Sequence, residues 1–206
     1  RDILTQRPGT TFISEVKASQ CRYDDIAAKG GRPIMWKTGH SLMKAKLKAE
    51  SAVLAGEMSG HMFFADRYFG FDDAIYASCR LVEILAKTKR SLSSLVADLP
   101  QTTVTPEIRV DCPDTLKFQL VDQVRTQLAA YLAEGQPVGA SNLRMRELVT
   151  IDGVRAIFED GWGLIRASNT QPALVLRFEA PSPARLDVIR ATIETELAQA
   201  RRVLST

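Results

Sequence analysis

The chain has 206 residues, of which 45% are hydrophobic and 25% are charged, a composition typical of a globular protein with one large or two small cores. Lys and Arg number 27 against 24 Asp and Glu, and the formal charge of +3 is too small for a surface that coats a nucleic acid. No run of roughly 18 apolar residues could span a bilayer, and three widely separated cysteines favour a reduced, cytoplasmic setting.

The first half of the chain alternates strand-like and helix-like segments, which predicts an α/β layered domain over residues 1–101. It begins without Met, and residues 2–5 read as the tail of a helix, so we expect a fragment of a longer protein. The expected elements are a strand at 12–16, a helix near 24–29, a strand at 34–36, a helix after 39–41, a strand at 53–56 and a helix at about 72–86. The apolar residues that recur at helical spacing in the last helix are Ile75, Cys79, Val82 and Leu85.

A second domain, over residues 102–206, follows a linker rich in Pro and Thr between about Asp98 and Pro106. The dipeptide Asp152-Gly153 predicts a tight hairpin turn, because it tolerates positive φ. The order of elements predicts an α+β domain with a four-stranded antiparallel sheet that two helices cover on one face. The expected elements are a strand at 107–110, a helix from about Leu116 that ends before Gly135, a hairpin at 149–157, strands at 163–166 and 174–178, and a helix spanning Leu186 to Leu197.

The most informative segment of the first domain is GEMSGH, from Gly56 to His61. If it is extended, Glu57, Ser59 and His61 project to one face, because side chains alternate along a strand. A carboxylate offers two acceptor oxygens that suit two vicinal sugar hydroxyls, and the Ser59 hydroxyl can donate or accept. The alternative interpretation is a polar strand end that faces water.

The segment RASNTQP, from Arg166 to Pro172, lies between two apolar strands of the second domain. A guanidinium binds a phosphate through two parallel charge-assisted hydrogen bonds, and the neighbouring hydroxyl and amide groups can complete the oxygen shell. These residue types indicate an anion site, and the alternative is an ordinary polar turn. The polar neighbours of Arg166 are Ser168, Asn169 and Thr170.

Three further residues, Lys17, Gly39 and His40, follow the first two expected strands. Loops after the carboxyl ends of strands are where open α/β sheets bind ligands, so these residues are expected to share one rim with Glu57. The alternative for Lys17 is a plain exposed side chain, and each histidine could be structural.

Three segments, in this order and spacing, resemble the α-D-phosphohexomutase family: WKTGHS at 36–41, GEMSGH at 56–61 and RASNT at 166–170. The Glu-Met-Ser-Gly form resembles the phosphomannomutase/phosphoglucomutase branch in particular. The segment RYFGFDD at 67–73 extends the match, and the resemblance spans nearly the whole chain.

The resemblance implies the third and fourth domains of a four-domain enzyme that interconverts hexose 1-phosphate and 6-phosphate of glucose or mannose. It implies transfer from a phosphoserine through a hexose 1,6-bisphosphate, so that the sugar binds in two orientations. The residue roles that it implies are the 3- and 4-hydroxyls of the sugar for Glu57 and Ser59, the non-reacting phosphate for Arg166, Ser168, Asn169 and Thr170, lesser substrate contacts for Lys17, Gly39 and His40, and general acid/base catalysis for His61.

Two motifs of that family, the nucleophile Thr-Ala-Ser-His-Asn-Pro and the magnesium loop Asp-Gly-Asp-Gly-Asp-Arg, do not occur in these residues. We therefore expect no metal ligand here, Mg²⁺ in the full-length parent only, and no catalysis by this chain alone. The expected partners are a phosphosugar and the N-terminal domains of the same monomeric enzyme, with no nucleic acid and no membrane. The alternatives are a stand-alone phosphosugar-binding module without catalysis and a fragment of a phosphoglucosamine mutase.

Overall fold

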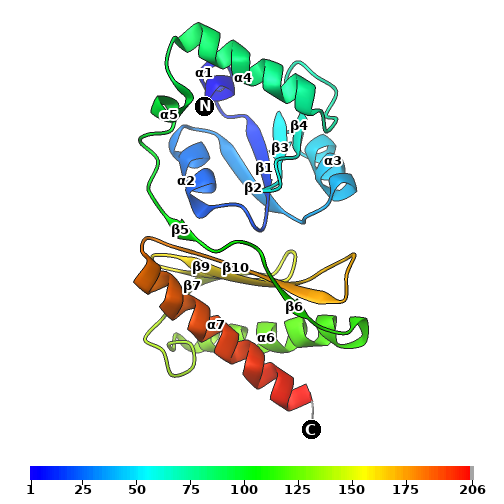
Figure 1. The fold of residues 1–206 in the computed structure, drawn as a ribbon, viewed down its shortest axis with the longest axis vertical. Helices are drawn as coiled ribbons and strands as arrows, with labels where there is room; N and C mark the ends of the chain where they lie inside the picture. The colour runs from blue at the N-terminus through cyan, green and yellow to red at the C-terminus, as the bar shows by residue number, and fades with distance from the viewer. Residues whose placement is uncertain (205–206) are drawn as a thin grey trace. The chain divides into compact units, whose positions relative to one another are not determined.

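The structure is a computed structural model that describes residues 1–204. The chain folds as two compact units, residues 1–100 and residues 101 onward (Figure 1). Each unit has its own sheet and its own apolar core. No helix within residues 1–204 is both long enough and apolar enough to cross a membrane.

The first unit is built on a mixed sheet with the strand order β2-β1-β3-β4. β1 pairs in parallel with β2 and β3, whereas β4 runs antiparallel to β3. The strands are β1 (Thr11–Glu15), β2 (Arg32–Trp36), β3 (Leu54–Gly56) and β4 (Met62–Phe64). The helices before and between the first three strands are α1 (Asp2–Gln6), α2 (Gln20–Ala28) and α3 (His40–Ala49). This confirms the expected α/β class, and β4 is a strand that the sequence pattern did not predict.

The central strand β1 is buried on both faces, as a strand between two helical layers must be. Phe12 packs in a cluster with Ile26 of α2, and the next residue, Ile13, packs in a second cluster with Met43 of α3. Because successive side chains point to opposite faces, the two helices cover opposite sides of the sheet.

The helix α4 (Ala74–Thr88) forms as expected, but its predicted apolar face does not pack within the unit. Ile75 and Val82 are 80% and 63% exposed, and the buried residue of this helix is Arg80. The Arg80 guanidinium lies 4.9 Å from the centre of the Phe64 ring and donates a 2.8 Å hydrogen bond to Asp66. The helix is therefore anchored through Arg80 together with Tyr76 and Ala77, which pack against the cluster that contains Phe12. A short helix α5 (Leu92–Leu95) follows it.

The second unit has one antiparallel sheet with the order β5-β10-β9-β8-β7, and β6 also pairs with β10. Within the described residues this sheet has six strands, so the expected number of four is wrong. The strands β5 and β6 pair with successive stretches of β10 and form one interrupted edge; β6 corresponds to the strand expected at 107–110, whereas β5 was not expected. The strands are β5 (Thr103–Val104), β6 (Ile108–Asp111), β7 (Met145–Val149), β8 (Val154–Phe158), β9 (Trp162–Ala167) and β10 (Ala173–Ala180).

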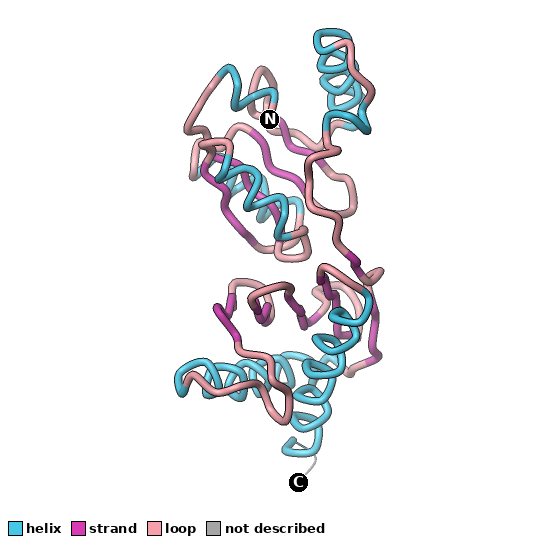
Figure 2. Tube along the Cα trace, turned by 90° about the vertical axis from the view of Figure 1, so that its left-hand side faces the viewer, coloured by secondary structure: helices cyan, strands magenta, loops and turns pink. Residues whose placement is uncertain are grey.

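Two helices, α6 (Asp114–Glu134) and α7 (Pro183–Leu204), cover one face of this sheet, as expected (Figure 2). Apolar residues of both helices, such as Val124 and Ile193, belong to one cluster with Ile165 and Phe178 of the sheet. The core of this unit therefore forms between the two helices and one face of the sheet.

The hairpin β7–β8 turns at Asp152-Gly153, as expected, but β7 spans Met145–Val149, so the expected strand at 149–151 is placed too late. Gly153 has a φ of 83°, and a Cβ there would lie 2.4 Å from the carbonyl oxygen of Ile165. This position requires glycine both for its backbone conformation and for the close approach of β9.

Candidate functional site

The segment from Glu57 to His61 is a tight turn between β3 and β4, so the condition of an extended segment is not met. The Glu57 N–H donates to the His61 carbonyl oxygen at 2.9 Å, and the Gly60 N–H donates to that of Glu57 at 3.1 Å. The turn nevertheless places polar groups together, because the Ser59 hydroxyl lies 3.4 Å from Glu57 Oε2 and donates to it. Turn geometry, in place of strand alternation, brings these residues together.

The loop after β2 meets this turn. Gly39, with a φ of 132°, is the N-cap of α3, and its N–H donates to Glu57 Oε1 at 2.9 Å. His40 begins α3, and its ring centre lies 4.2 Å from that of His61 in a T-shaped arrangement. The structure thus brings Gly39, His40, Glu57, Ser59 and His61 together.

The buried carboxylate of Glu15 joins the loops that follow β1, β2 and β3. Glu15 is fully buried. Its Oε2 accepts a 2.7 Å hydrogen bond from the Thr38 hydroxyl and a 3.3 Å bond from the Lys17 N–H, and its Oε1 accepts a 3.0 Å bond from the Met58 N–H. Lys17 is itself buried, with its ammonium 4.0 Å from Glu15 Oε2. Sequence reasoning missed Glu15, although a carboxylate at the end of an apolar strand is a signal that could have found it.

Asp72, which precedes α4, is a second residue that sequence reasoning did not select. Its Oδ2 lies 2.7 Å from His61 Nδ1 and 3.8 Å from His40 Nε2. Its Oδ1 accepts a 3.2 Å hydrogen bond from the Met62 N–H, which fixes the carboxylate against β4. A carboxylate at one ring nitrogen of a histidine sets the tautomer and presents the other nitrogen for chemistry.

In the second unit, Arg166 near the end of β9 is 6% exposed and pairs with Asp152 of the hairpin turn. The two contacts are 3.2 Å from Nε to Oδ2 and 3.3 Å from Nη2 to Oδ1, so the planar fork of the guanidinium already faces an acidic group. Asn169 and Thr170 are exposed on the loop that follows. The pairing with Asp152 was not expected from the sequence.

Lys117 of α6 holds the backbone of the loop after Arg166 in place. The buried Lys117 ammonium donates to the carbonyl oxygens of Ser168 at 2.6 Å and Gln171 at 3.0 Å. The Ser168 hydroxyl accepts from the N–H groups of Thr170 and Gln171 at 3.4 and 3.2 Å. Ser168 therefore shapes the loop, whereas Asn169 and Thr170 keep their side chains on its surface.

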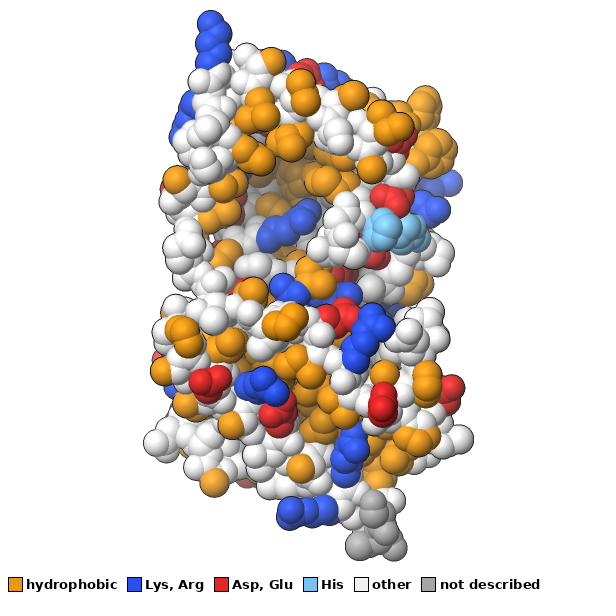
Figure 3. Space-filling view, viewed as in Figure 1, with side chains coloured by type: hydrophobic (Ala, Val, Ile, Leu, Met, Phe, Trp, Pro, Cys, Tyr) orange, Lys and Arg blue, Asp and Glu red, His pale blue; other side chains and the backbone are white. Residues whose placement is uncertain are grey.

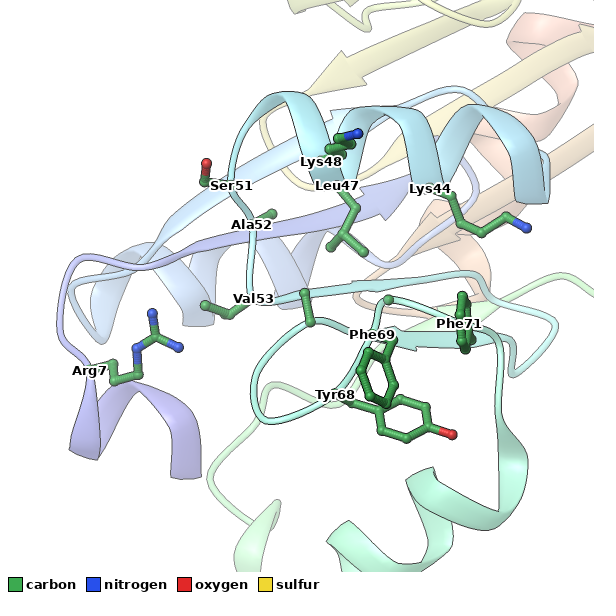
Figure 4. A pocket seen from close by; sticks show the side chains of 12 residues that line it. Arg7, Lys44, Leu47, Lys48, Ser51, Ala52, Val53, Tyr68, Phe69 and Phe71 are labelled. Atoms are coloured by element: carbon green, nitrogen blue, oxygen red, sulfur yellow. The ribbon is translucent and has the colours of Figure 1, made fainter.

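Two hollows accompany these elements, one in each unit. A cavity of about 230 Å³ in the second unit includes Arg125, Asp152 and Asn169, so it borders the loop after Arg166. A cavity of about 500 Å³ in the first unit lies between α3 and the loop after β4, with Leu47 facing the rings of Tyr68 and Phe69 (Figure 4). The larger cavity includes no residue of the Glu57 turn, so the volume of a hollow does not locate the candidate site in this unit.

Both units place polar side chains on loops at strand ends, such as Glu57 in the first unit and Asn169 in the second. The family models for the phosphoglucomutase/phosphomannomutase alpha/beta/alpha domain III and C-terminal domain match residues 1–103 and 107–196. The chain therefore belongs to the phosphoglucomutase/phosphomannomutase family and corresponds to the C-terminal portion of its members.

Individual relatives agree with this assignment. The chain is 46% identical over 197 residues to a phosphomannomutase/phosphoglucomutase of Pseudomonas putida, which covers 96% of this chain and 40% of the relative. It is 44% identical to a phosphoglucomutase of Neisseria gonorrhoeae, with 92% and 39% covered. A crystal structure of a phosphoglucomutase/phosphomannomutase family protein from Burkholderia thailandensis superposes with a TM-score of 0.82 at 42% identity, over 97% of this chain and 40% of that one. The chain thus spans about two-fifths of the length of the relatives it matches.

Proposed function

We propose that this chain binds the sugar ring and the non-reacting phosphate in a phosphohexomutase that interconverts glucose or mannose 1-phosphate and 6-phosphate. The observation that carries the proposal is the convergence of Glu57, Ser59 and His61 on one turn, with the carboxylate oriented by the Gly39 N–H. The names of the relatives support a hexose phosphate as the substrate class. We assign the transfer of the phosphoryl group to the rest of the enzyme, outside this chain.

The proposed ring contact rests on the acceptor capacity of Glu57. Its Oε1 already accepts from the Gly39 N–H, and its Oε2 lies beside the Ser59 hydroxyl. A carboxylate has about four lone-pair sites, so two remain for vicinal sugar hydroxyls. The 3- and 4-hydroxyls stay near the same place when the ring reverses its orientation, and one such clamp would therefore serve both halves of the reaction.

The proposed phosphate contact rests on Arg166 and the exposed loop after it. The guanidinium is buried and preorganised by Asp152, and an incoming phosphate would take the same fork of donors. Asn169 and Thr170 lie beside it with free surface positions, and the Lys117 ammonium secures the loop backbone. Phosphate binding would therefore require an exchange of one anionic partner of Arg166 for another.

The proposed proton transfer rests on the contact between His61 and Asp72. With its Nδ1–H donated to the Asp72 carboxylate, His61 presents Nε2 with a lone pair, which can accept a proton from a sugar hydroxyl as it is phosphorylated. The same nitrogen can return the proton in the reverse direction. Lys17, Gly39 and His40 are proposed as lesser contacts around this centre.

The family resemblance implies Mg²⁺, but the residues present do not fit that ion. The cluster of metal-type donors within residues 1–204 consists of two imidazoles and one carboxylate, whereas Mg²⁺ prefers oxygen ligands in octahedral geometry. We therefore assign no step of this chain to Mg²⁺, and we expect no turnover by the chain alone. Its proposed partner is the remaining part of a monomeric, cytoplasmic mutase that carries the phosphoserine.

Calorimetry with glucose 1-phosphate tests the binding role directly. We expect the Glu57→Gln variant to bind roughly tenfold more weakly or worse, because hydrogen bonds to a charged acceptor are lost. Glu159→Gln, which changes an exposed carboxylate of the second unit, is the matched control and should bind like the wild type. Equal affinity of Glu57→Gln and wild type would contradict the proposal, as would conversion of glucose 1-phosphate to 6-phosphate by the chain alone.

A further inference from the structure

The two histidines of the chain and Asp72 form a cluster of ligand-type atoms. His40 begins α3, His61 ends the turn after β3, and Asp72 forms a bridge with β4 just before α4. One ligand atom of each residue lies within 4.8 Å of the others. Figure 3 shows the two imidazoles side by side on an open face of the first unit.

The distances between these atoms suit a small transition-metal ion. Ligands at about 2.0–2.2 Å from Zn²⁺ in a tetrahedral arrangement lie about 3.3 Å from each other. The contacts of Asp72 Oδ2, 2.7 Å to His61 Nδ1 and 3.8 Å to His40 Nε2, bracket that separation. Both imidazole side chains are 44% exposed, so an ion can reach both rings from solvent.

The carboxylate of Asp72 is already oriented for such a role. Its Oδ1 is engaged by the Met62 N–H, and its Oδ2 faces both histidines. Three protein ligands with a remaining open position are typical of zinc sites that accept water or another oxygen as the fourth ligand. A polar shell that fixes one ligand oxygen is a recurrent feature of metal sites.

We propose that His40, His61 and Asp72 bind one divalent transition-metal ion of the Zn²⁺, Co²⁺ or Ni²⁺ class. Two imidazoles with one carboxylate favour these ions over Mg²⁺ and Ca²⁺, which take oxygen ligands. The site is therefore chemically distinct from a magnesium site.

A metal at this position would act on His61, an inference that rests on the proposed function. A metal bound to Nδ1 leaves the proton of a neutral imidazole on Nε2, and that nitrogen then cannot accept a proton from a hydroxyl. Ions of the zinc class would in this way inhibit the enzyme by occupying the proposed acid/base residue His61.

Titration of the chain with ZnCl₂ by calorimetry, and with CoCl₂ by visible absorption, tests the site. We expect one equivalent to bind, with affinity reduced at least about tenfold in His40→Ala and in Asp72→Asn, since even outer-shell changes typically cost that much. His61→Ala should abolish the cobalt absorption bands of the bound ion. Because the chain has only two histidines, their two sets of imidazole NMR signals report directly on the ligands.

Two control variants distinguish this site from metal binding elsewhere on the chain and from sugar binding. Cys79→Ser removes an exposed thiol and should leave Zn²⁺ affinity unchanged. Glu57→Gln should weaken binding of glucose 1-phosphate while retaining the metal, so that failure of the proposed function and failure of the metal site give different results. The metal site is overturned if no saturable binding occurs, if Cys79→Ser removes it, or if His40→Ala and Asp72→Asn, shown to be folded by circular dichroism, bind like the wild type.

Discussion

The guanidinium of Arg166 and the carboxylate of Asp152 face each other at the open end of the hairpin β8–β9 with contacts of 3.2 and 3.3 Å. Both side chains are largely buried, at 7% and 14% exposure, so the pair is shielded from screening by solvent. Asp152 orients the Arg166 guanidinium, which is the proposed phosphate-binding group, and also competes with the phosphate for that guanidinium. Substitutions of Arg166 and of Asp152 are therefore expected to change the binding of glucose 1-phosphate in opposite directions.

Arg166→Ala should weaken the binding of glucose 1-phosphate by more than about tenfold, because a charged bidentate donor is removed. Arg166→Lys should recover only part of this loss, since an ammonium lacks the planar fork. Calorimetry measures both affinities. Arg190→Ala, an exposed arginine on α7, is the control, and equal affinities of Arg166→Ala and wild type would exclude the proposed contact.

Asp152→Asn should have the reverse effect and tighten the binding of glucose 1-phosphate severalfold. The amide keeps a hydrogen bond to Arg166 but no longer repels an incoming phosphate dianion, because it carries no charge. Because the pair is largely buried, this gain should depend only weakly on salt. Weaker binding of Asp152→Asn at low salt would instead mean that Asp152 acts only by orienting Arg166.

Lys117→Met should loosen the loop after Arg166. The ammonium donates to the carbonyl oxygens of Ser168 and Gln171, and these acceptors lose their partner when the donor is removed. We expect a loss of about 1–3 kcal/mol in the free energy of unfolding of the second unit. Hydrogen exchange of the backbone N–H groups of residues 168–171 should become faster, and unchanged exchange rates would contradict this anchoring role.

Glu15→Gln should disturb the first unit although the change is isosteric. The buried carboxylate accepts hydrogen bonds at both oxygens, and an amide replaces one acceptor by a donor that faces the donors of Thr38 or Met58. The expected cost is about 1–3 kcal/mol in the free energy of unfolding. Urea unfolding of the first unit measures it, with Glu50→Gln at the C-cap of α3 as the comparison.

Glu196 of α7 makes the stability of the second unit dependent on pH. It is 1% exposed, and neither of its carboxylate oxygens has a hydrogen-bond partner among the described residues. Burial raises the pKa of Glu196 above its ordinary value of 4.5, so the folded state holds a proton that the unfolded state has released.

The raised pKa determines the sign of this dependence. The contribution of the Glu196 carboxyl group to stability is complete below its pKa in the unfolded chain. It is lost as pH rises through its pKa in the folded unit. Glu196→Gln should therefore stabilise the unit at pH 8 and change it little at pH 4, as urea unfolding at the two pH values would measure. An equal effect of the substitution at both pH values would contradict the assignment to this carboxyl group.

Much of the fold could be predicted because apolar periodicity reports local structure. The alternation of strands and helices in the first half predicted an α/β layered domain, and the Asp152-Gly153 dipeptide predicted a hairpin turn. The number of strands in the second sheet was wrong; β5 has only two residues and is too short to produce a pattern of its own. The exposed face of α4 was also beyond prediction, since apolar spacing shows which face of a helix is apolar and not what covers it.

The sequence by itself determined the classes of the two units and the short segments that carry the candidate side chains, because both depend on residues close together in the chain. Tertiary structure alone decided which groups meet those side chains: Glu15 beneath the loops of three strands, Asp72 against His61, and Asp152 against Arg166. These contacts join residues separated by 43, 11 and 14 positions, respectively. Strand order and packing decide which residues form these contacts, because they bring distant segments together only when the whole unit has folded.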